Sequence, residues 1–182
     1  MPNIHIDHPL LKQLQAFNLE AAKEFPTSFD PGLGQISLLL EMPLKHGGYY
    51  CTPLNSLSFG GTGCDGVHFS FIVENNSITE DSPVIVTTPE GGCGYSSPIA
   101  AENLRDFLRA SLIGGFLVHG SLSTYLHTGK NPHAGCRIPD DLAPIRDALA
   151  ERFSLTPQNY SLNELHALQA RHQSKILYPS WD

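Results

Sequence analysis

The chain has 182 residues, of which 41% are apolar and 16% charged, and it carries a formal net charge of -7 at pH 7. This length and composition predict one globular domain over residues 1–182, with an α+β core at 1–127 and a helical C-terminal extension at 128–182, and they exclude a disordered chain. No apolar run approaches the roughly 20 residues of a membrane span, and the first residues lack the basic start and apolar core of a signal peptide, so we expect a cytoplasmic protein without membrane contact.

The first elements are a helix, a turn and a short apolar segment. Asp7 followed by Pro9 predicts a helix start, with Asp7 as the N-cap and Pro9 in the first turn. Apolar residues recur along it at helical spacing, at Leu10, Leu14, Phe17 and Ala21. Pro26 ends this helix, and Phe29 to Gly32 form a turn. Residues 35–42 fit either a buried strand or a helical turn, because periodicity does not separate the two.

Residues 49–73 are predicted to form a central hairpin. Tyr49 to Cys51 suit a strand, which Pro53 restricts to an edge or a short length and which can resume over Leu54 to Phe59. The run from Val67 to Val73 alternates strictly, with phenylalanine at 69 and 71 on one face. His68 and Ser70 therefore lie on the opposite face. A glycine-rich loop at 60–66 joins the two runs and is interpreted as a tight turn with positive φ angles.

The second half of the chain is predicted to be mainly helical after a strand at 83–88. Ser97 and Pro98 have the form of an N-cap and first helical residue, and Gly114-Gly115 ends that helix. Further helices are expected at 116–127, at 141–153, and from the Ser161 capping box to Ile176. This layout predicts an α+β fold with an N-terminal helix, a central antiparallel sheet and C-terminal helices packed on it.

Two nucleotide-binding interpretations of the glycine loop fail on context. Residues 61–66 match Gly-x-Gly-x-x-Gly, but a strand pattern follows where a dinucleotide-binding fold needs a helix. A protein-kinase glycine loop needs a lysine on a following strand, and none occurs before Lys130. His119, Ser121 and Ser123 also lack the glycines of a nucleophile elbow. No cofactor is therefore expected.

The candidate site residues gather around the glycine loop. Asp65 and His68 can reach one end of the hairpin, where a carboxylate would orient the imidazole as a general base beside the thiol of Cys64 or Cys51. The same residues, with His46 added, also suggest a zinc site of thiolate and imidazole ligands. Neither arrangement has diagnostic spacing, so no metal is predicted. The alternative is structural, with Asp65 bound to turn amides and His68 to the backbone.

The distribution of charge favours a basic protein partner. No lysine or arginine occurs between Lys45 and Arg105, whereas the interval contains carboxylates at Asp65, Glu74, Glu80, Asp81, Glu90 and Glu102. A surface built from this interval would repel nucleic-acid phosphates, so nucleic-acid binding is not expected. It would attract a basic protein.

Two stretches resemble a known group of proteins. The first runs from Thr52-Pro53-Leu54-Asn55-Ser56 through Phe59 and Thr62-Gly63 to Asp65-Gly66-Val67-His68-Phe69, and the second joins Pro83 to Val86 with Ile99 to Leu108. Together they are similar to a group of bacterial proteins of unknown function and, more loosely, to the SUKH superfamily, many of whose members are immunity proteins against secreted toxins. The resemblance implies a non-enzymatic protein-binding role with no catalytic residues. The alternative, on the residues alone, is a small hydrolase or metal-binding enzyme using Asp65, His68 and a cysteine.

Overall fold

The computed structural model describes residues 4–27, 30–89, 97–131 and 134–179. It has an N-terminal helix, a central antiparallel sheet and C-terminal helices, so the predicted α+β class is confirmed. In the part of the chain that the model describes, no helix is long and apolar enough to cross a membrane. Phe29, Cys93, His133 and Trp181 lie outside the described residues.

A five-stranded antiparallel sheet in the order β2-β3-β4-β6-β7 forms the centre of the molecule. Its strands are β2 (Leu39–Lys45), β3 (Ser56–Gly61), β4 (His68–Ile72), β6 (Val84–Thr87) and β7 (Ile99–Ala101). Gly61 pairs with His68, which confirms that the glycine loop closes the β3–β4 hairpin. β1 (His5–Ile6) and β5 (Ser77–Ile78) form a separate parallel pair.

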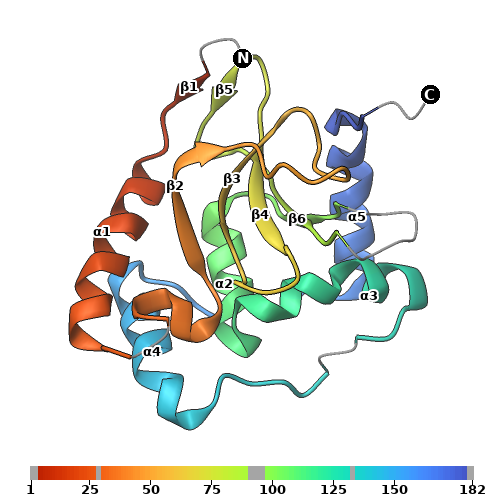
Figure 1. Ribbon diagram of the computed structural model, residues 1–182. Coiled ribbons are helices and arrows are strands. Elements are labelled where there is room, and N and C mark those ends of the chain that lie inside the picture. Colours follow the sequence, from red (N-terminus) through yellow and green to blue (C-terminus); the bar gives the residue numbers. More distant parts are fainter. Residues whose placement is uncertain (1–3, 28–29, 90–96, 132–133, 180–182) are drawn as a thin grey trace.

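One face of the sheet packs on an aromatic core. Phe59, Phe69 and Phe71 point from β3 and β4 toward α2 (Leu104–Gly114), where Phe107 contacts Phe59 and Phe69 with ring centroids 5.8 and 4.9 Å apart. Figure 1 shows α2 behind the sheet and α1 (Pro9–Glu24) beside β2. The strict alternation of β4 places its phenylalanines in this core and His68 and Ser70 on the other face, as predicted.

The second face carries a polar layer and a smaller apolar cluster. Buried hydroxyl side chains line it at Thr52, Ser56, Ser58, Ser70, Thr87 and Ser97. Beside them, Ile72, Ile85 and Ile99 pack against Leu168 of α5 (Leu162–His172). The Gln169 amide accepts a hydrogen bond from the Ile99 N–H at 2.7 Å and donates one to the Ile99 carbonyl at 2.8 Å. The Gln169 side chain thereby hydrogen-bonds the backbone N–H and carbonyl that edge strand β7 would otherwise leave unpaired at Ile99.

The predicted cap of the first helix is wrong by one residue. The N-cap of α1 is His8, whose Nδ1 accepts a hydrogen bond from the Leu11 N–H, while Glu80 accepts one from Leu10. The Asp7 N–H donates to the Ile78 carbonyl, so Asp7 extends the β1–β5 pairing instead of capping the helix. His8 is fully buried against Phe71, and burial lowers its pKa.

Two further local predictions are corrected. Ser97 and Pro98 precede β7 rather than a helix, because residues 99–101 pair with β6; α2 begins six residues later than predicted, behind the Asn103 cap. Tyr49 to Cys51 form a turn, closed by the Thr52 N–H donating to the Tyr49 carbonyl, and not a strand. Both segments have favourable local sequences for the predicted structure, so tertiary pairing overrides them.

The remaining helices follow the predicted order. The ambiguous segment 35–42 divides between η1 (Gly32–Ile36) and β2. The α2 helix ends at Gly115 with a positive φ, as expected, and 116–128 splits into η2 (Phe116–Ser121) and α3 (Leu122–Thr128). After η3 (Asp140–Leu142) come α4 (Ala143–Arg152), α5 and η4 (Gln173–Lys175). The Ser161 capping box of α5 is present.

Candidate functional site

His68 lies at the start of β4 with both ring nitrogens engaged. Its Nδ1 lies 2.8 Å from the Gly66 carbonyl oxygen, which can only accept, so Nδ1 carries the proton and donates. In the neutral ring, Nε2 then accepts from the Thr52 hydroxyl at 3.2 Å. Thr52 is fully buried and also accepts a hydrogen bond from the Tyr49 N–H. The imidazole therefore fastens the 49–52 turn to the glycine loop.

Burial keeps this imidazole neutral. Desolvation lowers the pKa of His68, opposed by its hydrogen bond to Gly66 and by the charge of Glu41. Because both nitrogens serve the protein itself, His68 would have to break one of these bonds to accept a proton from a substrate or to bind a metal.

Two glycines make room for the ring and its neighbour. A Cβ on Gly47 would lie 2.3 Å from His68 Nε2, and a Cβ on Gly66 would lie 2.6 Å from the Tyr49 ring. Tyr49 stacks on His68 with centroids 5.5 Å apart and planes at 20°. Gly66 also has a φ of +67°, which favours glycine. The glycines thus pack a histidine–tyrosine stack and close a turn.

The other sequence-predicted residues of the loop share an open cavity with His68. This cavity, about 390 Å³, is lined by Cys64, Asp65 and His68 as well as by Glu41 and Lys45. In the described part of the chain no hydrogen bond joins Asp65 to His68, because the Gly66 carbonyl occupies the position expected for the carboxylate. Cys64 is exposed, with its sulfur 3.5 Å from the Thr62 hydroxyl.

His46 and Cys51 lie in backbone contacts. His46 Nδ1 accepts from the Gly48 N–H and its Nε2 lies 3.1 Å from the Pro53 carbonyl oxygen. Cys51 is buried, which raises the pKa of its thiol. Over residues 4–27, 30–89, 97–131 and 134–179, no three His, Cys, Asp or Glu side chains gather as a metal-binding group.

Replacing Thr52 with valine tests the structural role of His68. Valine keeps the shape but leaves His68 Nε2 and the Tyr49 N–H without the hydroxyl, so we expect the free energy of unfolding to fall by about 1–3 kcal/mol. Urea denaturation measures this, with exposed Thr124→Val as the control, expected to change by less than about 0.5 kcal/mol. A Thr52→Val protein as stable as wild type would contradict the role.

Three described carboxylates of the cation-free interval are bound by groups from elsewhere in the fold, two of them in ion pairs. Glu74 forms an ion pair with Lys175 at 2.9 Å, and Glu102 contacts both Arg171 and His172. Glu80 accepts from the backbone of α1. The interval therefore does not form a continuous uncompensated anionic surface, and its charge acts mainly through the net charge of the protein.

An exposed apolar surface lies beside the buried polar layer. We call it the tyrosine–leucine patch, and its members are Tyr49, Tyr50, Leu54, Leu177 and Tyr178, with 44, 61, 58, 56 and 37% of each residue exposed. The Leu54 N–H donates to the Leu177 carbonyl at 2.7 Å, so the 49–54 turn and the C-terminal segment run side by side. Ser97 links Tyr178 to the same turn, since its carbonyl lies 3.5 Å from the Tyr178 hydroxyl and its own hydroxyl donates to Cys51.

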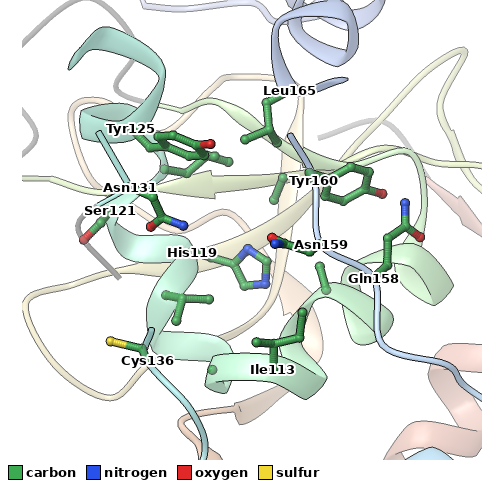
Figure 2. Close-up of a pocket in the computed structure, with 15 residues that line it drawn as sticks. Ile113, His119, Ser121, Tyr125, Asn131, Cys136, Gln158, Asn159, Tyr160 and Leu165 are labelled. Carbon is green, nitrogen blue, oxygen red and sulfur yellow. The ribbon is translucent and has the colours of Figure 1, made fainter. Parts of the chain in front are cut away.

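A second pocket contains His119, which the sequence indicated only as part of an incomplete nucleophile elbow. Figure 2 shows His119 of η2 in a pocket between α2, α3 and the segment that carries Gln158, Asn159 and Tyr160. These residues are about 40 positions apart in the chain and have no motif in common, so only the fold brings them together.

Comparison with known proteins adds no identification. No protein-family model, curated protein or solved structure matches this chain. The similarity to the SUKH superfamily thus remains a prediction from sequence.

Proposed function

We propose that this chain is a non-enzymatic protein-binding domain whose contact surface is the tyrosine–leucine patch. The observation that carries the proposal is the clustering of five large exposed apolar side chains on two adjacent segments. Soluble proteins seldom expose such clusters without a binding role, and tyrosine is enriched among the residues that dominate binding energy. The SUKH-like resemblance implies the same class of function.

The backbone under the patch is well ordered by hydrogen bonds. The Asn55 side chain accepts from the Leu177 N–H at 2.8 Å and donates to the Lys175 carbonyl at 2.9 Å. The Tyr50 hydroxyl donates to the Pro89 carbonyl at 2.8 Å. A preorganised surface loses less conformational entropy on binding, which favours affinity.

The proposed partner is a basic protein. The net charge of -7 would attract it and raise the association rate, while the apolar patch would supply most of the affinity. Internal pairing of Glu74 and Glu102 limits how much a local acidic contact contributes. We also propose a bacterial, cytoplasmic setting, which rests on the sequence and the resemblance alone.

The hydrolase alternative has weaker support. It needs His68 as a base, and the protein uses both nitrogens of that ring. Thr52, the hydroxyl in contact with His68, is fully buried and so is out of reach of a substrate.

Affinity capture from a bacterial lysate tests the proposal with matched variants. We expect Tyr50→Ser/Leu54→Ser to reduce capture of a basic partner at least about tenfold, because central apolar contacts carry most binding energy. The control is Leu19→Ser/Leu117→Ser, which removes two side chains from residues that are 67 and 47% exposed on other elements and should leave capture unchanged. Raising the salt concentration should slow association of the wild type.

Two outcomes would argue against this function. One is equal capture by wild type and the Tyr50→Ser/Leu54→Ser variant. The other is equal loss in both double variants, which would indicate nonspecific adsorption of exposed leucine rather than a defined surface.

A further inference from the structure

The pocket around His119 is small and built from several separate parts of the fold. Its volume is about 110 Å³. Its walls come from β7, α2, η2, α3, the loop after α3, the segment before α5 and α5 itself, and none of its lining residues belongs to the tyrosine–leucine patch. For scale, a cavity of roughly 150 Å³ holds benzene. The His119 pocket therefore suits a molecule, or the end of a molecule, of about four non-hydrogen atoms.

The His119 ring is held rigidly by its surroundings. Only 7% of the residue is exposed, and the ring stacks on Phe107 with centroids 4.5 Å apart and planes at 28°. Its Nε2 lies 2.9 Å from the Ser111 oxygen. The Ser111 hydroxyl donates its own hydrogen to the Phe107 carbonyl at 2.8 Å. With the Ser111 hydroxyl donating to Phe107, the Ser111 oxygen accepts from His119, and this arrangement assigns the ring proton to Nε2.

This tautomer leaves Nδ1 as an acceptor that the described residues do not use. No hydrogen bond from residues 4–27, 30–89, 97–131 or 134–179 reaches Nδ1, and it is not among the unpartnered atoms sealed from solvent. His119 and Asn159 both line the pocket, and Figure 2 shows the Asn159 carboxamide turned toward the ring of His119. A buried imidazole thus presents one lone pair to the pocket, in contrast to His68, whose two nitrogens are both occupied.

The described lining of the pocket is uncharged. It includes no Asp, Glu, Lys or Arg side chain, and its polar groups are hydroxyls, carboxamides, a thiol and the imidazole. Burial lowers the pKa of His119 to about 3, so the ring is neutral at physiological pH. Burial, with a smaller effect from Asp106, raises the pKa of Tyr160 to about 12, so its hydroxyl also stays neutral. A charged ligand would lose its hydration here without gaining an ion pair.

Among the described residues, His119 does not pair with Cys136 or Ser121 as a base with its nucleophile. Figure 2 shows the Cys136 sulfur pointing away from His119, and Ser121 likewise. A ring that protonates only near pH 3 is also a weak base at neutral pH. The arrangement is suited to recognition and not to acyl transfer.

We propose that the His119 pocket is a binding site for a small uncharged amide, whose N–H donates to His119 Nδ1 and whose carbonyl accepts from the Asn159 carboxamide. An amide supplies the donor that Nδ1 requires and carries no charge to desolvate. Its flat shape also allows contact with the tyrosine rings at 125 and 160 that line the pocket.

Titration of the isotope-labelled full chain with acetamide, followed by NMR, tests this site. We expect acetamide to shift the ring resonances of His119 and the backbone resonances near Asn159 in a saturable way. Acetate, ethylammonium and N,N-dimethylacetamide are probes of similar size that are charged or lack the N–H donor. They should require at least about tenfold higher concentrations, because each loses the buried hydrogen bond or pays a charge desolvation cost.

Two variants distinguish the pocket from other sites. His119→Phe keeps the stack on Phe107 but removes the acceptor, and Ala110→Leu fills the pocket while leaving His119 in place. Both should abolish the acetamide shifts. If His119→Phe fails to fold, Ala110→Leu alone tests whether acetamide binds in the His119 pocket. Absence of shifts in the wild type would mean that the pocket holds water only. That result, acetate binding as well as acetamide, or binding retained in a folded variant would overturn the proposal.

Discussion

Replacing Phe107 with alanine is expected to lower the free energy of unfolding by about 3–5 kcal/mol. Phe107 is fully buried on α2 and contacts four rings, with centroids 5.8 Å from Phe59, 4.9 Å from Phe69, 5.4 Å from Phe116 and 4.5 Å from His119. Truncation removes the apolar transfer energy of the ring and leaves a cavity that these rigid neighbours cannot fill.

Chemical denaturation of matched variants measures this effect. Phe107→Leu keeps most of the volume and should lose less than about 2 kcal/mol. Leu19→Ala removes a side chain from an exposed residue of α1 and should change the stability by less than about 0.5 kcal/mol. If Phe107→Ala lost no more than Leu19→Ala, the aromatic cluster could not be the main core of the fold.

The Phe107→Ala variant also reports on the pocket. Its cavity borders the ring of His119, so water entering there would reduce the desolvation that lowers the pKa of His119. We expect the His119 pKa to rise toward its ordinary value in this variant, and not in Phe107→Leu.

The elements that sequence predicted well are those set by local chemistry. The apolar face of α1, the alternation of β4 and the Ser161 capping box each depend on residues a few positions apart in the chain. Periodicity and capping describe such interactions directly. The glycine loop was also recognised as a turn, since the strand after it excluded a phosphate-binding helix.

The predictions that failed depend on distant partners. Ser97 and Pro98 have good helix-start chemistry, yet the residues after them form β7 because β6 pairs with them on one side and Gln169 satisfies Ile99 on the other. Gln169 lies 70 positions along the chain from Ile99, so no local pattern indicates this contact. Asp7 does not cap α1 for a similar reason. Its N–H pairs with the Ile78 carbonyl of β5, and His8 is the N-cap instead.

The same limit applies to the candidate sites. His68 stood out because glycines, a cysteine and an aspartate surround it in sequence, but in the fold its nitrogens bind Gly66 and Thr52. His119 lies in an ordinary apolar stretch, and its significance comes from Ser111 fixing the tautomer and from the pocket at Nδ1. The two histidines differ in the hydrogen-bond partners that the fold gives their ring nitrogens, and composition does not reveal this difference.

Acidification is expected to destabilise the protein strongly before its carboxylates are fully protonated. The pKa of His119 falls from 6.5 in the unfolded chain to about 3 in the fold, so below pH 6.5 the unfolded state binds a proton that the native state does not. Stability is therefore complete above about pH 6.5 and falls as the pH decreases toward 3. From pH 7 to pH 4, His119 alone should cost about 3 kcal/mol. Burial lowers the pKa of His8 and His68 as well, so both add to the loss.

Urea denaturation of wild type and His119→Phe across this pH range isolates the contribution of the one ring. The variant keeps the stack on Phe107 but has no group to protonate, so its stability should fall by about 3 kcal/mol less than that of the wild type between pH 7 and pH 4. Leu19→Ala removes an exposed side chain without a titratable group from α1 and should leave the wild-type pH dependence unchanged. Parallel curves for wild type and His119→Phe would mean that the native ring protonates near its ordinary pKa. Water would then reach it, and the neutral lone pair on which amide recognition depends would be lost in mild acid.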